Sequence, residues 1–192
     1  MIKKLIIFFQ ILFIYLFTLN ISFADLQKEL INKVSATKTL SFNFKQKIAK
    51  KEETGNCFIK YPLLMKCEYQ NIKKKILISN GKTLAIIKKK YKKIYYYPLR
   101  STPLFIILQK EKILSLIRNN QPIKINSNEI KFELIDDKSN KLKIFFDKDS
   151  LNFSGWKTKD AYSNDVSFVI TDLKTNITIE DKFFKIPKEE DL

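Results

Sequence analysis

The residue types that usually carry chemistry are scarce in this chain. Cys57 and Cys67 lie ten residues apart, without a Cys-x-x-Cys spacing or a Cys/His cluster, so zinc binding and thioredoxin-like exchange lack their ligands. The chain has no histidine, which excludes Ser-His-Asp and Cys-His triads and histidine-based zinc sites. With three glycines in all, a glycine-rich phosphate loop could hardly be built. We therefore expect no catalytic residue, no metal site and no cofactor.

Three acidic pairs could in principle form a glycosidase dyad. Glu52-Glu53, Asp136-Asp137 and Glu189-Glu190 fall in predicted turns or in the C-terminal tail, where solvated surface is the better interpretation. The protein is therefore expected not to be an enzyme. The cysteine spacing leaves two states open, because an exported compartment would permit a disulfide but does not require one.

The first 24 residues have the three-part pattern of a secretory signal. Lys3 and Lys4 precede an apolar stretch that continues to Phe17, and Ser22-Phe23-Ala24 provides small residues for a signal peptidase. A retained membrane anchor is the alternative, but polar residues interrupt a run that is barely long enough to span a bilayer. We expect cleavage after Ala24 and export to the periplasm without a lipid-attachment cysteine.

Cleavage would leave 168 of the 192 residues, enough for one domain at residues 25–192. The formal charge of +16 falls to +14 without Lys3 and Lys4, which raises nucleic acid or anionic membrane as partners. Only two of the 36 basic residues are arginines, and arginine is the favoured residue for bidentate phosphate and base contacts. We therefore expect no nucleic-acid partner, and we expect a monomer.

Hydrophobic periodicity changes several times along the chain. Residues 26–34 have the apolar spacing of a short amphipathic helix, and from Leu40 the period becomes that of a half-buried strand. Asn80-Gly81 predicts a tight hairpin between residues 76–79 and 82–87. Pro103, with Thr102 as its cap, predicts one helix that ends near residues 119–120. Further strands are predicted at 57–61, 65–70, 94–97, 130–134, 142–146, 166–170 and 176–179.

Nine to eleven short antiparallel strands with one apolar face must curl that face around a core. The predicted fold is therefore mainly β, a single-domain unclosed antiparallel β-barrel of about 11 strands with helices covering its mouth as a lid. An inward face rich in aromatic side chains is consistent with a packed core. A barrel of this strand number also has room for an apolar ligand.

In the order of these elements and their motifs, the chain resembles the periplasmic outer-membrane lipoprotein carrier (LolA-like) family. The likeness covers nearly the whole mature chain and rests on the order and spacing of individually weak motifs. These motifs are Leu40 to Gln46, Gly55 to Pro62 with Lys66 to Tyr69, Ser79 to Leu84, Thr102-Pro103-Leu104, Leu151 to Trp156 with Asp160, Asn176 to Ile179 and Phe183 to Pro187.

The resemblance implies a carrier that holds the acyl chains of lipoproteins in a hydrophobic cavity. An inner-membrane lipoprotein-releasing ABC transporter would load it, and an outer-membrane acceptor would receive the cargo, so the protein would act as a chaperone in outer-membrane biogenesis. The cavity and lid residues expected on this basis are Leu26, Leu30, Val34, Phe42, Phe44, Ile59, Tyr61, Met65, Tyr69, Leu104, Ile107, Leu108, Phe132, Ile144 and Phe168.

Two departures from the family pattern concern the lid and the cysteines. Tyr61 stands where the family usually has an arginine that latches the lid, and one hydroxyl cannot replace five donors. Cys57 and Cys67 share the parity of Ile59 and Met65, so a hairpin turned near Pro62 would bring them together on one face. This favours a disulfide, although two small inward residues would equally enlarge the cavity.

Two other functions compete with the lipoprotein carrier. A carrier of a glycolipid or free lipid could use the same barrel and lid, because neither specifies a head group. A basic surface module for anionic lipid or polysaccharide could use Lys73-Lys74-Lys75 and Lys88-Lys89-Lys90. Binding by such a surface would collapse at high salt, whereas cavity binding would persist.

Overall fold

The computed structural model describes residues 23–70, 74–126, 128–135, 141–160 and 163–192. Residues 1–22 of the predicted signal and the pair Asp136-Asp137 lie outside the described residues. The helices are α2 (Phe23–Ala36), α3 (Leu104–Ile107) and α4 (Lys110–Asn119), with short 3-10 turns η1 (Lys89–Tyr91), η2 (Leu99–Ser101), η3 (Asp181–Phe184) and η4 (Glu189–Asp191). The strands are β1 (Thr39–Ile48), β2 (Lys51–Lys60), β3 (Leu64–Tyr69), β4 (Lys75–Asn80), β5 (Thr83–Lys88), β6 (Lys93–Pro98), β7 (Lys124–Ile125), β8 (Glu129–Ile135), β9 (Lys141–Asp147), β10 (Phe153–Lys159) and β11 (Asp165–Thr175).

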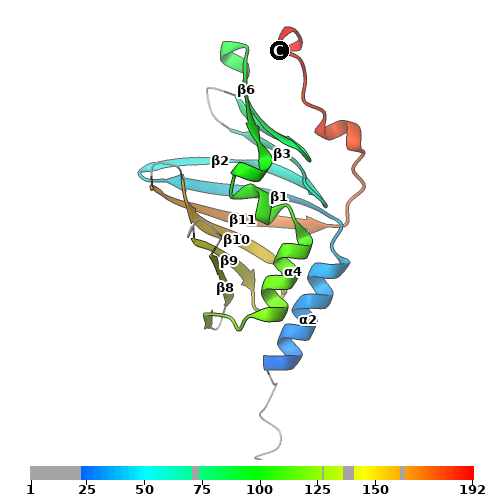
Figure 1. Ribbon diagram of the computed structural model, residues 1–192, viewed down its shortest axis with the longest axis vertical. Coiled ribbons are helices and arrows are strands. Elements are labelled where there is room, and N and C mark those ends of the chain that lie inside the picture. The colour runs from blue at the N-terminus through cyan, green and yellow to red at the C-terminus, as the bar shows by residue number, and fades with distance from the viewer. Residues whose placement is uncertain (1–22, 71–73, 127, 136–140, 161–162) are drawn as a thin grey trace, which may run out of the picture.

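These strands form one antiparallel sheet of 11 strands in the order β6-β5-β4-β3-β2-β1-β11-β10-β9-β8-β7. The sheet is strongly curved, and its end strands β6 and β7 do not pair with each other (Figure 1). The predicted fold class, an unclosed β-barrel with a few helices, is therefore confirmed. Within the described chain, no helix is long and apolar enough to cross a membrane.

Side-chain alternation along the strands separates the buried, concave face of the sheet from the exposed face. Along β1 the side chains of Leu40, Phe42 and Phe44 are buried, while Asn43 between them and Lys45 after them are exposed. Successive side chains point to opposite faces, so one row enters the core and the other meets water. The predicted Asn80-Gly81 turn joins β4 to β5, with Gly81 at a positive φ of 96° that a glycine adopts without strain.

A glycine in β2 allows an aromatic ring to lie flat on the strand. A Cβ at Gly55 would come within 2.2 Å of the Glu68 carbonyl oxygen and 2.7 Å of the Phe44 ring. The Phe44 ring therefore occupies the place of the missing side chain. This close approach brings β1, β2 and β3 together at the centre of the concave face.

The helices lie over this concave face, with α2 and α4 packed side by side (Figure 1). The prediction of one helix from Pro103 was wrong in one respect, because the chain breaks into α3 and α4 at Gln109, whose backbone is extended. The Leu108 carbonyl accepts a hydrogen bond from the Leu63 N–H at 3.0 Å, a tertiary partner in place of the next helical turn. The Thr102 hydroxyl donates to the Leu99 carbonyl and does not cap α3 as predicted.

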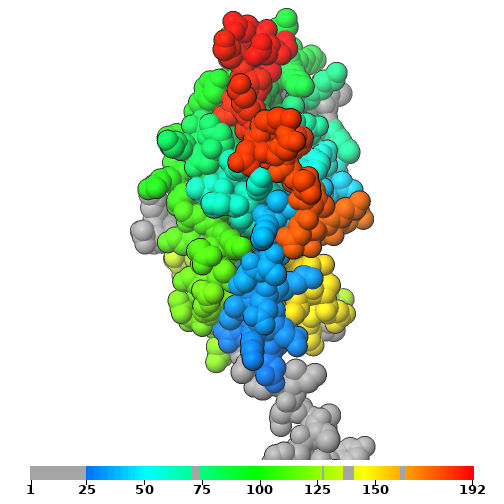
Figure 2. Space-filling view, turned by 90° about the vertical axis from the view of Figure 1, so that its right-hand side faces the viewer, coloured from blue at the N-terminus to red at the C-terminus, as the bar shows by residue number. Residues whose placement is uncertain are grey.

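The C-terminal segment corrects the prediction of closing strands. The predicted strand at residues 176–179 is absent: the chain bends at Asn176, which has a positive φ of 57°, and residues 177–180 form no strand. Their backbone is bound by side chains instead, since the Thr39 hydroxyl donates to the Ile177 carbonyl and the Lys60 ammonium to the Ile179 carbonyl. Residues 181–192 then cross the outer face of the sheet, as Figure 2 shows from the side of α2. There Phe183 packs against Phe58 with ring centroids 5.0 Å apart.

Candidate ligand cavity

All the residues predicted to line a cavity or lid gather in one apolar cluster between the concave sheet face and the helices. Leu26, Val34, Tyr61 and Leu104 are partly buried at its margin. The other predicted residues are buried within it: Leu30, Phe42, Phe44, Ile59, Met65, Tyr69, Ile107, Leu108, Phe132, Ile144 and Phe168. The sequence therefore identified the interior, but most of these side chains fill it and do not border an open space.

Two hollows lie within this apolar interior, apart from an open groove of about 700 Å³ beside Lys60 and Lys110, and the larger of the two has a volume of about 200 Å³. Of the predicted residues, Phe42, Met65, Tyr69, Leu104 and Phe168 line it. It extends from the start of α3 along the inner face of β1 to β4 and reaches the surface beside β10. It is also lined by residues that the sequence patterns did not indicate as cavity residues: Gln46, Ile48, Leu77, Pro103, Trp156, Thr158, Lys159, Asp160 and Val166.

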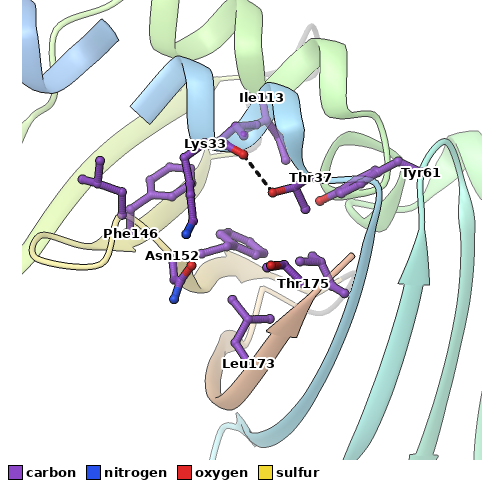
Figure 3. Close-up of a pocket in the computed structure, with 12 residues that line it drawn as sticks. Lys33, Thr37, Tyr61, Ile113, Phe146, Asn152, Leu173 and Thr175 are labelled. Atoms are coloured by element: carbon purple, nitrogen blue, oxygen red, sulfur yellow. Dashed lines mark hydrogen bonds between the residues drawn. The ribbon is translucent and has the colours of Figure 1, made fainter. Parts of the chain in front are cut away.

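A smaller hollow of about 30 Å³ lies beneath α2 at the opposite end of the interior. Figure 3 shows Lys33 of α2 and Thr37, which directly follows this helix, on one side of the hollow, with Phe146, Asn152 and Leu173 on the other. Here the Thr37 hydroxyl donates to the Lys33 carbonyl at 2.9 Å, which terminates the helix. Of the predicted residues, Val34 and Tyr61 border this hollow.

A continuous file of aromatic rings connects the two hollows. Phe153 borders the smaller hollow and is stacked on Trp156, which borders the larger one, with centroids 5.9 Å apart. Trp156 is in turn stacked on Phe168 at 3.9 Å, and Phe168 on Phe44 at 4.7 Å. These rings form a floor on which apolar side chains of the helices rest. These rings expose no polar group except the Trp156 indole nitrogen, so the floor is suited to contacts with apolar groups.

Volume limits what the closed interior can hold. Sites for small molecules usually measure roughly 300–1,000 Å³. The larger hollow, at about 200 Å³, is below this range, and the smaller one could take little more than a water molecule. A long acyl chain would therefore enter only if the helices move away from the aromatic floor and join the two hollows.

The contacts that hold the helices closed do not come from Tyr61. Its hydroxyl has no hydrogen-bond partner among the described residues, and burial raises its pKa above the usual range for tyrosine. Lys110, at the start of α4, donates from its ammonium group to the Ser35 carbonyl at 2.9 Å and the Thr37 carbonyl at 3.2 Å. A cation at the C-terminal end of α2 also opposes the partial negative charge there.

Two further latches act along the same helices. The Gln27 side-chain amide donates to the Ile117 carbonyl near the end of α4. The Leu63 N–H donates to the Leu108 carbonyl between α3 and α4, and the Leu63 carbonyl accepts from the Ser79 hydroxyl at 2.6 Å. In this structure, lysine, glutamine and backbone groups therefore hold the helices in place.

Polar groups border the end of the larger hollow that lies farthest from α2. The Tyr69 hydroxyl donates to the Gln46 side-chain oxygen at 2.8 Å, and burial raises the pKa of Tyr69. Beside them Glu53 is buried and bonded to Lys75 at 2.6 Å and to Lys51 at 3.0 Å. Burial alone would raise the pKa of Glu53, but the hydrogen bonds from Lys75 and Lys51 outweigh it and hold the pKa below its usual value. Glu53 thus remains an anion that anchors Lys75 over the Tyr69 ring.

Cys57 and Cys67 face each other across β2 and β3 and form a disulfide on the wall of the larger hollow. The bond joins neighbouring strands directly under the cavity. Its two small side chains leave room that larger residues would fill. Among the described residues, no group of three His, Cys, Asp or Glu side chains is placed to hold a metal ion.

Comparison with known proteins agrees with this architecture. The family model described as outer membrane lipoprotein carrier protein LolA matches residues 35–187. A comparison with curated proteins gives no match.

Solved structures with a similar fold share few identical residues with this chain. A LolA superfamily protein of Nitrosomonas europaea is 8% identical with a TM-score of 0.46, and the match covers 83% of this chain and 97% of that one. A putative outer membrane lipoprotein-sorting protein domain of Vibrio parahaemolyticus is 11% identical with a TM-score of 0.47, covering 83% and 94%. MucB in the MucA/MucB complex of Pseudomonas aeruginosa is 9% identical with a TM-score of 0.47, covering 86% and 62%. Because the family match spans most of the sequence, the chain belongs to the outer membrane lipoprotein carrier protein (LolA) family.

Proposed function

We propose that this protein is a periplasmic carrier that shelters the acyl chains of lipoproteins and carries them from an inner-membrane ABC transporter to the outer membrane, without catalysing a reaction. Family membership supports the carrier class. The observation that carries the proposal is the aromatic floor between two hollows, covered by helices that a few hydrogen bonds hold in place. Displacing those helices would expose a continuous apolar trough.

The energetics of this exchange suit a shuttle. Transferring an acyl chain of about 16 carbons from water to an apolar trough gains about 0.8 kcal/mol per methylene, or roughly 12 kcal/mol. Lid contacts made by residues such as Leu104 and Ile107 must be given up in return. The net affinity is therefore far below the gross value, and the cargo can be released to an acceptor.

Trp156 provides an internal reporter for a test. It is the only tryptophan of the chain and borders the larger hollow. A synthetic lipopeptide with bromine atoms on its acyl chains would quench Trp156 fluorescence on contact. Titrating the mature protein with this lipopeptide in solution therefore measures both binding and its location.

A variant of the cavity edge makes the test specific. Leu104→Glu places a carboxylate in the cavity wall at a half-buried site, where burying the charge under an acyl chain is unfavourable. We expect binding at least about tenfold weaker in a protein that still folds. Val169→Glu is the matched control, because Val169 is 48% exposed on the outer face next to Phe168. Unchanged quenching in Leu104→Glu, or none in the wild type, would count against the proposal.

Three further measurements test the cargo, the signal cleavage and the oligomeric state. Mass spectrometry of lipid extracted from protein purified without detergent would reveal a glycolipid or free lipid as cargo in place of lipoprotein. N-terminal sequencing of the exported protein would read Asp25-Leu26 if the predicted signal is cleaved after Ala24. A monomer in solution is expected, and sedimentation measurements would check it.

A further inference from the structure

The hairpin between β5 and β6 carries a concentrated positive charge. Residues 88–93 include five lysines and no acid, and residues 89–93 are all exposed. The turn η1 forms the tip of this hairpin, which projects from the end of the sheet away from α2 and α4 (Figure 1). The lid and the hairpin tip therefore lie at different ends of the molecule.

Exposed aromatic rings accompany these lysines on β6, an end strand of the sheet. Tyr95 is 43% exposed and Tyr97 is 44% exposed. Tyr95 pairs with Ile86, which in turn pairs with Leu77 of β4, and Leu77 borders the larger hollow. One row of side chains on the concave side thus runs from the cavity wall to the free edge of the sheet.

A row of cations runs beside this apolar row. Lys88 and Lys93 are register partners across β5 and β6, so they lie on the same side as Tyr95, and Lys75, the partner of Lys88 on β4, is paired with Glu53. The Lys88 ammonium lies 4.8 Å from the centre of the Tyr95 ring. The concave side of the hairpin is therefore both basic and aromatic.

The C-terminal tail covers part of the opposite side of the hairpin, although Tyr96 on that side remains 56% exposed. Ile186 and Leu192 pack against the apolar outer cluster formed by Ile76, Ile78, Ala85, Ile87 and Ile94. The Glu189 carboxylate accepts the Ile94 N–H at 2.9 Å, and Glu190 is paired with Lys188 at 2.9 Å. The tail thus packs on the outer side and Glu189 reaches the free edge of β6, so the concave side of the hairpin is the one left to meet a partner.

We infer that the concave side of the β5–β6 hairpin docks on an anionic lipid bilayer. Clustered lysines are attracted to anionic headgroups. Tyrosine rings favour the headgroup level of a bilayer, because there the apolar ring contacts lipid while the hydroxyl contacts water. Docked in this way, the row Tyr95, Ile86 and Leu77 leads from the bilayer surface towards the cavity. Only this route rests on the proposed carrier function, because docking itself requires no cargo.

Vesicle binding of the mature, cargo-free protein tests the inference. The wild type is expected to cosediment with vesicles of phosphatidylglycerol and phosphatidylcholine, to bind pure phosphatidylcholine vesicles much more weakly, and to lose binding at high salt. Each lysine near an anionic surface contributes about a fivefold change in affinity. The triple variant Lys89→Gln, Lys90→Gln, Lys92→Gln should therefore bind on the order of 100-fold more weakly. The matched control removes the same charge at Lys47, Lys50 and Lys174, which are exposed elsewhere.

Tyrosine variants distinguish this side of the hairpin from general attraction by charge. Tyr95→Ser with Tyr97→Ser should weaken vesicle binding several-fold, whereas Tyr96→Ser, on the outer side of the same strand, should not. Equal loss in the Lys47, Lys50 and Lys174 control overturns the inference, as does wild-type binding by either hairpin variant. Binding to a soluble polysaccharide or protein but not to anionic vesicles overturns it as well. Quenching of Trp156 by the brominated lipopeptide in solution is a separate readout, so a failed carrier and a failed docking surface are told apart.

Discussion

Lys110 offers the sharpest test of the closed lid. Its ammonium group joins the start of α4 to the Ser35 and Thr37 carbonyls at the end of α2. Lys110→Met keeps the length and apolar stem of the side chain but removes both hydrogen bonds. If an acyl chain binds only to the open form, a change that favours opening must increase its apparent affinity.

The size of the effect follows from these two contacts. Hydrogen bonds from a charged donor contribute about 1.5–3 kcal/mol each when they are sheltered from water. The bond to Ser35 is exposed and the bond to Thr37 is partly buried, so solvent screening reduces their sum to about 1–2 kcal/mol. We therefore expect Lys110→Met to unfold at a lower denaturant concentration and to bind the brominated lipopeptide about 5-fold to 30-fold more tightly.

Trp156 quenching and chemical denaturation measure the two effects on the same samples. Lys110→Arg, which retains donors, should behave like the wild type. Lys112→Met is the matched control, because Lys112 lies half a turn further along α4 without a described partner for its ammonium group. Weaker or unchanged binding by Lys110→Met, or the same gain in Lys112→Met, would refute the opening mechanism.

Four other changes probe the interior and its cargo. Glu53→Gln should lower the free energy of unfolding by about 1–3 kcal/mol at neutral pH. Because the pKa of Glu53 is lowered in the folded state, its contribution to stability is complete above the usual glutamate pKa and is lost as the pH falls through the folded-state pKa. Denaturation curves of wild type and variant should therefore converge in acid. Gly55→Ala should cost about 1–3 kcal/mol or prevent folding, as a thermal melt would show, because its Cβ would overlap the Glu68 carbonyl. Cys57→Ala with Cys67→Ala should lower the free energy of unfolding by about 2–4 kcal/mol in urea, while lipopeptide binding persists. A lipopeptide with one acyl chain should bind at least about tenfold more weakly than one with two chains of the same length in the fluorescence titration.

Local sequence patterns predicted most of the fold because each pattern depends only on which side chains of a single strand, helix or turn are buried. The alternation around Phe42 and Phe44, the Asn80-Gly81 turn and the amphipathic spacing at residues 26–34 all reflect burial that the structure shows. Strand parity also predicted that Cys57 and Cys67 would be neighbours, since opposite residues of an antiparallel pair share a face.

Features that depend on distant partners could not be predicted in the same way. The alternation at Ile177 and Ile179 resembles a strand, but the Thr39 and Lys60 side chains take the carbonyls that a neighbouring strand would bind. The break at Gln109 depends on Leu63, which is remote in sequence. Lining residues such as Trp156 are identified only by the gap between side chains, which hydrophobicity does not encode.

A filled interior and a carrier function are compatible because the free energy needed to open the helical lid does not exceed the free energy gained by burying one acyl chain. The face of α4 that is buried in the closed lid includes Ile113, Leu114, Leu116 and Ile117. Burying one such side chain is worth about 1.5–3 kcal/mol, so fully exposing the four costs about 6–12 kcal/mol. The gross gain from one chain of about 16 carbons is roughly 12 kcal/mol. The first chain therefore gains at most about 6 kcal/mol beyond the cost of opening the lid, whereas a second chain enters a trough that is already open. A lid of this stability would weaken the binding of single-chain lipids and favour cargo that carries several chains.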